Sequence, residues 1–198
     1  IDWQEDEKLL SIEFPLDVNR DWASCEAQFG YLRRPTHRST SWDAAKFEVC
    51  AHRWVDLSEP GFGVAVLNDG RYGHGVQDGG IRVSLLRAPR YPDPTADRGR
   101  HRVTVSLLPH GAGLADVMTS AEALNTPLRV VDRGAEVVDT PVPVPLVSLS
   151  DPRVAVSAVK RAHDGSGDLI VRLWEATGDR VELGVTTSGT LTGVERCD

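Results

Sequence analysis

The chain has 198 residues and a formal net charge of −7, a size that suits one large domain or one domain with a small module. The acidic balance argues against a nucleic-acid partner, because such proteins carry a basic patch or stripe. No apolar run approaches the roughly 18 residues that a membrane span needs, so we expect no membrane segment. The three cysteines, Cys25, Cys50 and Cys197, indicate neither a disulfide framework nor a zinc ribbon, and favour a reducing, cytoplasmic location.

Short apolar runs with alternating polar residues dominate the first two thirds of the chain. They are rich in Val, Ile and Phe and are bounded by Gly, Pro and Asp, which predicts strands over 9–18, 45–57, 61–69, 81–89 and 101–109. Gly79 and Gly80 directly before the fourth run predict a hairpin turn.

One segment has helical rather than alternating spacing. Its apolar residues recur three or four positions apart, at Leu114, Val117, Met118, Ala121 and Leu124. Pro127 would stop the helix, so we predict one short helix within 114–126. A packing role is the favoured interpretation, and a cofactor-binding role for the stripe is the weaker alternative.

Three prolines at alternate positions in 140–146, "TPVPVPL", predict a stiff, extended linker. This linker would separate a β-sandwich domain over 1–139 from a small β module over 147–198. In the module, strands are expected over 153–162, 168–176 and 180–185. The acidic turn 163–168 lacks the ligand spacing of a calcium loop and predicts a Gly-rich hairpin turn.

Many short strands and few helices indicate an all-β protein, an antiparallel β-sandwich of supersandwich-like type with one short helix. The sequence has no nucleophile elbow, P-loop or dinucleotide fingerprint, and its six histidines form no metal-ligand pattern. Asp69 and Asp93 are the best carboxylate pair for glycosidase chemistry. We favour the alternative in which both cap their own turns.

Two turns contain the side chains that sugar sites use. "LNDGRYG" over 67–73 offers Asn68, Asp69 and Tyr72, and "LLRAPRYPDP" over 85–94 offers Arg87. Planar acids and amides, arginine forks and aromatic faces all suit hydroxyl-rich ligands. The same residue types also make ordinary turns, so the spacing alone leaves both interpretations open.

Four long motifs occur in the order typical of one family: "RPTHRSTSWD", "HRWVDLSEPGFGV", "LNDGRYG" and "LLRAPRYPDP". Together they make nearly the whole chain resemble the C-terminal region of alpha-mannosidases of glycoside hydrolase family 38, in the cytosolic and bacterial branch. Residues 153–176 resemble the small β module of these enzymes. The family's "NDCKYG" reads "NDGRYG" here, with Gly70 for cysteine and Arg71 for lysine.

The resemblance implies a catalytic β/α barrel and a helical bundle N-terminal to this β region. It places the aspartate nucleophile and a zinc site of two aspartates and two histidines in the barrel. No barrel motif occurs here, so we expect no catalytic residue and no metal ligand in this chain. Because the chain starts at Ile1 and its only methionine is Met118, we expect it to be a fragment of a longer polypeptide.

The resemblance also implies that the β region packs on the barrel and that some of its loops approach the active-site rim. Arg87 is the foremost candidate for binding mannose-containing glycans, with Asn68, Asp69 and Tyr72 beside it and Arg34 and His37 next. The alternative is that these residues form the interface between the domains. A docking patch around Trp22, Trp42 and Trp54 is expected on the isolated chain.

The predicted function is therefore an accessory β domain of a retaining alpha-mannosidase, inert by itself. A stand-alone carbohydrate-binding or adhesion β-sandwich is the alternative. Linkage specificity and oligomeric state are left open, including assembly as a homo-oligomer.

Overall fold

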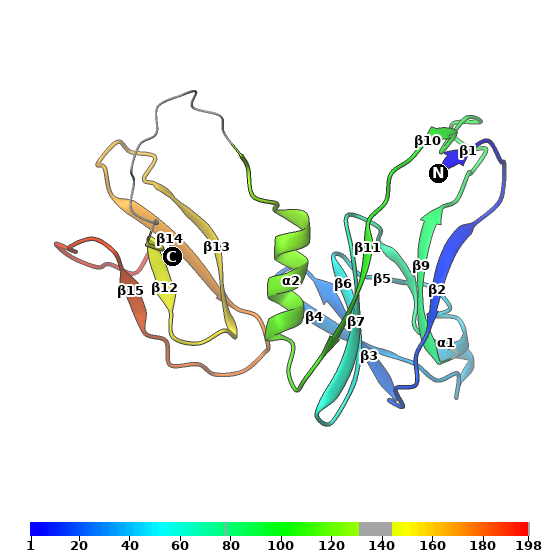
Figure 1. Cartoon of the computed structure of the whole chain (residues 1–198), viewed down its shortest axis with the longest axis horizontal. Helices are drawn as coiled ribbons and strands as arrows, with labels where there is room; N and C mark the ends of the chain where they lie inside the picture. Colours follow the sequence, from blue (N-terminus) through cyan, green and yellow to red (C-terminus); the bar gives the residue numbers. More distant parts are fainter. Residues whose placement is uncertain (78, 131–143, 198) are drawn as a thin grey trace. The chain divides into compact units, whose positions relative to one another are not determined.

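The structure is a computed structural model that describes residues 1–77, 79–130 and 144–197. It divides into two compact units, unit 1 over 1–127 and unit 2 over 128–198 (Figure 1). Antiparallel strands are the main regular structure of both units, which confirms the predicted all-β class.

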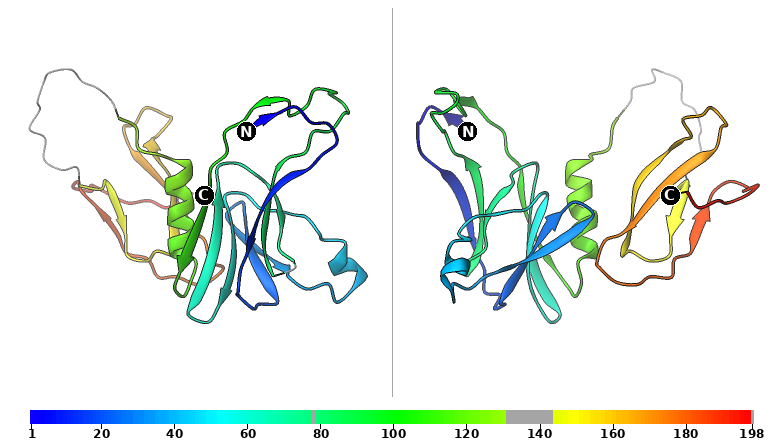
Figure 2. Two further views of the ribbon diagram at one scale, coloured as in Figure 1. Left: turned by 45° about the vertical axis from the view of Figure 1, so that its right-hand side comes forward. Right: turned by 180° about the vertical axis from the view of Figure 1, so that it is seen from behind.

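Unit 1 contains two main antiparallel sheets (Figure 2). The five-stranded sheet has the order β11-β7-β6-β3-β4, with β3 at Trp22–Ala27, β4 at Gly30–Pro35, β6 at Trp54–Glu59, β7 at Phe62–Asn68 and β11 at Val105–His110. The four-stranded sheet has the order β2-β9-β8-β5, with β2 at Leu10–Pro15, β5 at Val49–Cys50, β8 at Gly73–Gly75 and β9 at Gly80–Leu86. A two-residue ladder joins β1, Asp2–Trp3, to β10, Gly99–Arg100.

The core of unit 1 forms where alternating side chains of the two sheets meet. Val55 and Val66 from the five-stranded sheet lie in one buried cluster with Ile81 and Val83 from β9. Because successive strand residues point to opposite faces, their neighbours face away from this core. Full burial of such side chains stabilises by about 1.5–3 kcal/mol each.

Helix α2, Ala115–Asn125, covers the other face of the five-stranded sheet and confirms the predicted packing helix. Its fully buried Val117 and Ala121 pack against Trp54 and Leu67. The expectation of an exposed patch at Trp54 is therefore wrong, because alternation in β6 turns this side chain toward α2 and leaves it only 1% exposed. Trp42, by contrast, is 80% exposed.

Two parts of unit 1 differ from the expected strands. The run 45–57 divides between β5 and β6, which belong to different sheets, and α1, Ser41–Ala44, precedes it behind a capping box from Thr40 and Asp43. The hairpin of β3 and β4 was not predicted, because its two-residue turn contains Phe29 at a φ of 56° rather than the usual Asn-Gly.

Unit 2 consists of two separate antiparallel ladders. β12, Val147–Leu149, pairs with β15, Val185–Thr187, and β13, Val154–Arg161, pairs with β14, Leu169–Glu175. The turn between β13 and β14 is the predicted hairpin, in which Asp164 accepts a hydrogen bond from the Ser166 N–H. The expected strand over 180–185 is strand only at its last residue.

The predicted linker over 140–146 lies mostly outside the described residues, which resume at 144. The proposed domain limits at 139 and 147 accordingly stay predictions. No helix within the described ranges is long and apolar enough to cross a membrane.

Candidate functional site

Asn68 shapes the turn that follows β7. Its buried side chain accepts hydrogen bonds from the backbone N–H groups of Gly70, at 2.9 Å, and Arg71, at 2.5 Å. Its amide nitrogen donates to the carbonyl of His52 at 2.9 Å. Because both ends of the amide are engaged, Asn68 holds the turn rather than presenting a free group.

Two further contacts fix this turn to its surroundings. Asp69 accepts a hydrogen bond from the Thr104 N–H at 2.8 Å. Asn125, at the end of α2, donates to the Asn68 carbonyl at 3.0 Å. The turn is thus tied to the segment before β11 and to the helix, so its exposed side chains stand on a rigid base.

A second fixed feature is the corner at Arg87 and Ala88, directly after β9. Asp97 accepts hydrogen bonds from both backbone N–H groups, at 2.9 and 2.8 Å, and these bonds, that of Ala88 first, lower the pKa of its carboxyl. Ala88 is buried and has a φ of 48°, and its carbonyl accepts from the Glu7 N–H. A non-glycine residue with this φ persists only where its surroundings determine the backbone, as these hydrogen bonds do.

The turn and the corner lie at the same edge of unit 1. β8 pairs with β9 through His74 and Val83, and continuing that register places Arg71 opposite Leu86. The charge of Arg71 also contributes to the lowered pKa of Asp97. Both observations place the turn near the corner, while the binding role of their residues stays a prediction.

Two side chains at this edge are accessible. Tyr72 is 58% exposed and its ring lies 5.3 Å from that of His52. Arg87 is exposed, and its guanidinium has no hydrogen-bond or ion-pair partner among the described residues. An unpaired guanidinium fork suits a hydroxyl-rich or carboxylate group, and an exposed aromatic ring suits the apolar face of a sugar.

Arg34 and His37 lie elsewhere. Arg34 lies on the edge strand β4 and pairs with Ala23 of β3. This pair lies toward the end of the sheet where the β6–β7 hairpin turn is. Asn68 ends β7 at the opposite end of that sheet. His37 precedes α1, where its Nδ1 lies 3.7 Å from an Asp43 carboxylate oxygen.

The carboxylate pair proposed from sequence is engaged in turns. Asp93 accepts from both the N–H and the hydroxyl of Thr95, at 2.8 Å each, and these bonds, that of the N–H first, lower the pKa of Asp93. Asp69 caps the Thr104 N–H. The favoured interpretation, in which both aspartates cap turns, agrees with these contacts.

A buried cluster of Asp56, Ser58 and His110 was not predicted. Ser58 and His110 both lie opposite Gly63, whose missing side chain lets them approach each other. Asp56 accepts from the Ser58 hydroxyl at 2.7 Å and lies 2.8 Å from His110 Nε2, while burial raises the pKa of its carboxyl. Because the serine donates to the aspartate and not to the histidine, this is no activated nucleophile.

The resemblance implies a zinc site in these enzymes, and the described residues of this chain hold no ligand set for it. Within 1–77, 79–130 and 144–197, no group of three or more His, Cys, Asp or Glu side chains could hold a metal ion. The described residues therefore do not fit a zinc site, and we derive no catalytic step through zinc for them.

Parts of both units match models of one protein family. The model described as the glycosyl hydrolases family 38 C-terminal domain matches residues 1–95. The model described as the glycosyl hydrolases family 38 C-terminal beta sandwich domain matches residues 153–198.

Several curated relatives carry the name of one activity. Alpha-mannosidase 2C1 of Homo sapiens is 45% identical over 191 residues, which are 92% of this chain and 18% of that protein. An alpha-mannosidase of Saccharomyces cerevisiae is 36% identical over 214 residues, covering 99% of this chain and 19% of the relative. The chain thus spans about a fifth of the length of the relatives that it matches.

Solved structures show the same fold. An alpha-mannosidase from Enterococcus faecalis V583 superposes with a TM-score of 0.74 at 18% identity, over 90% of this chain and 21% of that one. Family models match both units, and the similarity to the curated relatives extends along almost the whole chain. The chain belongs to glycosyl hydrolase family 38 and consists of sequence from its C-terminal β region.

Proposed function

We propose that this chain is the accessory β part of a retaining alpha-mannosidase that hydrolyses terminal alpha-mannosides. The observation that carries the proposal is the match of both units to C-terminal domains of the family. The relatives named alpha-mannosidase support the substrate class, and they are about five times longer than this chain. The catalytic barrel of the same polypeptide is the proposed partner, and mannose-containing glycans are the proposed ligand.

We further propose that the edge formed by the 68–72 turn and the 87–88 corner lies at the active-site rim. Arg87 and Tyr72 would contact substrate, while Asn68 and Asp69 position the turn that carries Tyr72. Support comes from the rigidity of both backbone features, which are held by hydrogen bonds from several elements. A donor that is already oriented loses little conformational freedom when it meets the transition state.

Arg34 and His37 are not part of this edge, because they lie toward the other end of unit 1. They remain predicted substrate contacts, next after Arg87. Contact with the barrel is the alternative role for both.

The nucleophile and the zinc belong to the proposed catalytic part. Bound there, zinc would supply polarisation of the substrate, and this chain would supply positioning groups only. A cytosolic location is proposed from the branch that the sequence resembles and from three free cysteines, Cys25, Cys50 and Cys197.

A complementation experiment tests the function. The 198-residue chain and the remainder of its natural polypeptide would be purified separately and assayed with an aryl alpha-mannoside, alone and mixed. We expect no hydrolysis by the chain alone and restored hydrolysis by the mixture. Hydrolysis by the purified chain, or a natural reading frame that ends near this length, would refute the proposal.

A further inference from the structure

The outer face of the four-stranded sheet has an unusual row of residues. Arg82 on β9 pairs with Glu13 on β2 and with Gly75 on β8, so the three positions lie side by side across three strands. Ile81 and Val83 point into the core, and alternation turns Arg82 to the opposite face. At Gly75 that face of β8 has no side chain.

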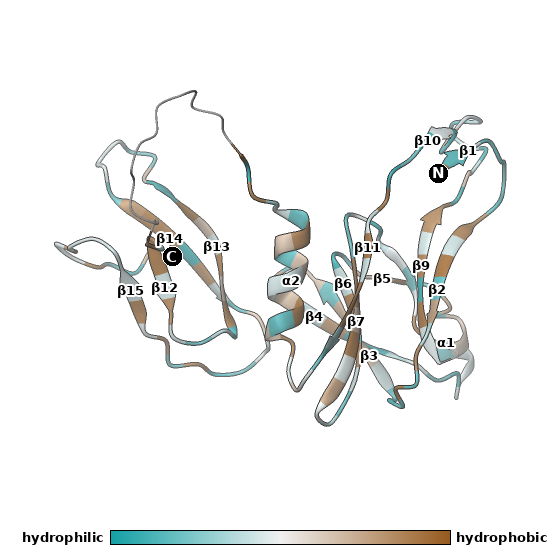
Figure 3. Cartoon of the chain, in the orientation of Figure 1, coloured by the Kyte–Doolittle hydropathy of each residue, from teal (hydrophilic) through white to brown (hydrophobic). Residues whose placement is uncertain are grey.

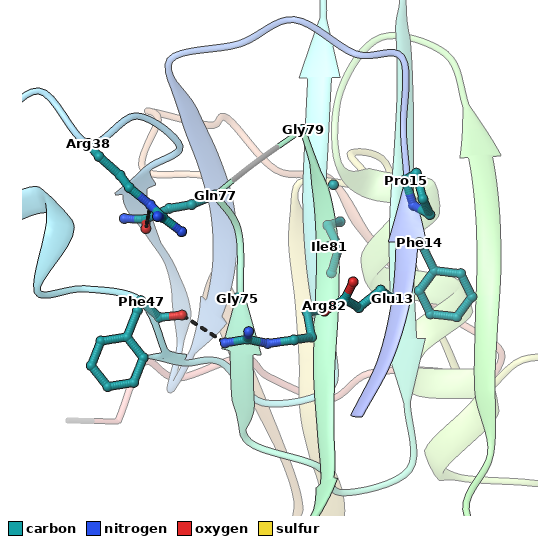
Figure 4. A pocket seen from close by; sticks show the side chains of 11 residues that line it. Glu13, Phe14, Pro15, Arg38, Phe47, Gly75, Gln77, Gly79, Ile81 and Arg82 are labelled. Carbon is teal, nitrogen blue, oxygen red and sulfur yellow. Dashed lines mark hydrogen bonds between the residues drawn. The ribbon is translucent and has the colours of Figure 1, made fainter. Parts of the chain in front are cut away.

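Gly75 lets the guanidinium of Arg82 lie flat over β8. A Cβ at Gly75 would lie only 3.1 Å from Nε and Nη2 of Arg82. Figure 4 shows the Arg82 side chain crossing β8 beside Gly75, where Nη2 donates to the Phe47 carbonyl at 3.0 Å. Its neighbour Nε is buried and has no hydrogen-bond partner among the described residues.

This row forms the floor of a pocket of about 140 Å³. Phe47 lines it with a ring that is 63% exposed. Another wall contains Arg38 and Gln77 (Figure 4), and Nε of Arg38 donates to the Gln77 amide oxygen at 2.8 Å. The Gln77 amide nitrogen in turn donates to the Asp43 carbonyl. The wall is therefore held in place by hydrogen bonds to the segment around α1.

The floor carries a donor and an acceptor that do not satisfy each other. Glu13 and Arg82 are directly paired residues, yet their side chains form no salt bridge, and the Glu13 carboxylate has no hydrogen-bond partner among the described residues. A ligand that both donates and accepts at adjacent positions would satisfy the pair. A pair of neighbouring hydroxyl groups has that property, because each hydroxyl is donor and acceptor.

We propose that this pocket is a binding site for a single neutral sugar residue, with two adjacent hydroxyls between Glu13 and Arg82 and the ring against Phe47. An exposed aromatic ring suits the apolar face of a sugar, and the Glu13 carboxylate offsets part of the positive charge of Arg38 and Arg82 that would favour an anion. Arg82 lies five strand residues, or about 16 Å, from Arg87. The site is thus separate from the proposed rim and does not depend on the proposed function.

Binding of methyl alpha-mannopyranoside, methyl beta-glucopyranoside and sodium sulfate to the 198-residue chain would be measured by NMR titration. We expect saturable binding of at least one sugar, with a dissociation constant on the order of 1–10 mM and shifts confined to the pocket. No saturation by either sugar at about 50 mM would overturn the proposal. Sulfate binding without sugar binding would also overturn it, in favour of an anion site.

Four variants locate the site. Arg82→Lys keeps the charge but loses the fork, and Glu13→Gln loses the charged acceptor, so each should weaken binding by on the order of tenfold. Gly75→Ala should weaken it similarly by displacing the guanidinium while both binding residues remain. Phe47→Ala removes an exposed ring that the fold does not need, so it tests the site even if a strand variant fails to fold.

Matched controls are available elsewhere on unit 1. Glu59→Gln changes an exposed carboxylate at the end of β6, and Tyr91→Ala removes an exposed ring after the Arg87 corner. Neither should change sugar affinity. If the controls weaken binding as much as Glu13→Gln and Phe47→Ala do, or if the four pocket variants bind normally, the assignment is wrong.

Discussion

Units 1 and 2 both contain antiparallel strands, but among the described residues only those of unit 1 enclose a core. Unit 1 contains nearly all of the fully buried apolar residues, between its two sheets and under α2. In unit 2, Ala176 alone among the described residues is a buried hydrophobic. The strands of both units carry the brown apolar residues of Figure 3.

The difference shows that two strands can pair without enclosing a core. The β13–β14 ladder contains seven residue pairs. More than 40% of the surface is nevertheless exposed at three of its apolar residues, Val156, Val159 and Leu169. A two-stranded ladder satisfies backbone hydrogen bonds but has no second layer to bury its side chains. Unit 2 is therefore expected to depend on apolar cover from other parts of the polypeptide.

Separating the units should have the largest effect. We expect residues 1–127 to fold cooperatively alone, because their core is internal, and residues 144–198 to remain largely unfolded alone. Circular dichroism during heating, together with the chemical-shift dispersion in an NMR spectrum, checks both pieces. A sharp unfolding transition in the 144–198 piece would break the comparison.

Removing one buried ring in unit 1 should come next. Trp54→Ala should reduce the free energy of unfolding by about 3–5 kcal/mol, since the side chain is enclosed between the sheet and α2. Trp42→Ala, at an exposed position, should stay within about 0.5 kcal/mol. Urea denaturation measures both, and equal losses would contradict the assignment of the core.

Unit 1 is also where we expect a functional arginine. In the complete enzyme, Arg87→Lys should lower kcat by the equivalent of about 2–4 kcal/mol if its fork acts in the transition state, with the melting temperature unchanged. Arg172→Lys, at an exposed position of unit 2, is the matched control and should change neither quantity. A lower melting temperature with normal kcat per folded molecule would make Arg87 an interface residue, and unchanged values would remove it from the site.

Acid should weaken unit 1 through His74. Burial, the largest influence, lowers the pKa of this fully enclosed histidine from 6.5 to about 4, so the folded state binds a proton less readily than the unfolded state. Stability is then fully present above pH 6.5 and is lost as the pH falls toward 4. Between about pH 7.5 and 5 the loss should be about 2 kcal/mol.

The measurement is urea denaturation of 1–127 at both pH values. The exposed His37 provides the control, because His37→Gln should leave this pH dependence intact. A stability that does not change over this range would show that His74 is accessible to protons in the folded unit.

The smallest expected effect is a difference in reactivity between the buried thiol of unit 1 and the exposed thiols. Burial raises the pKa of Cys25, in the unit 1 core, to about 12, whereas Cys50 and Cys197 are exposed. Because the thiolate is the reactive form, a disulfide reagent at neutral pH should label two thiols quickly and the third only on unfolding. Three fast thiols in the native chain would mean that the core opens readily.

The local elements were predictable from the amino-acid sequence, because their signals lie within a few residues. Alternating runs predicted β7 and β9, helical spacing predicted α2, and a Gly-rich stretch predicted the β13–β14 turn. The family motifs pointed to the correct family. The hairpin of β3 and β4 was not predicted, because small strand residues such as Ala23 and a turn that contains Phe29 are weak sequence signals for a hairpin.

The neighbours that cover each face of a strand, and the distant turns that meet, depend on the assembled fold. The alternation of β6 is visible in the sequence, but α2 on the far side is what buries Trp54. The sequence also gave no reason to separate Arg34 and His37 from Arg87, since the order of strands in a sheet is not the order in the chain. The role of Gly75 depends on Arg82, a partner whose contact is set by strand register and not by sequence distance.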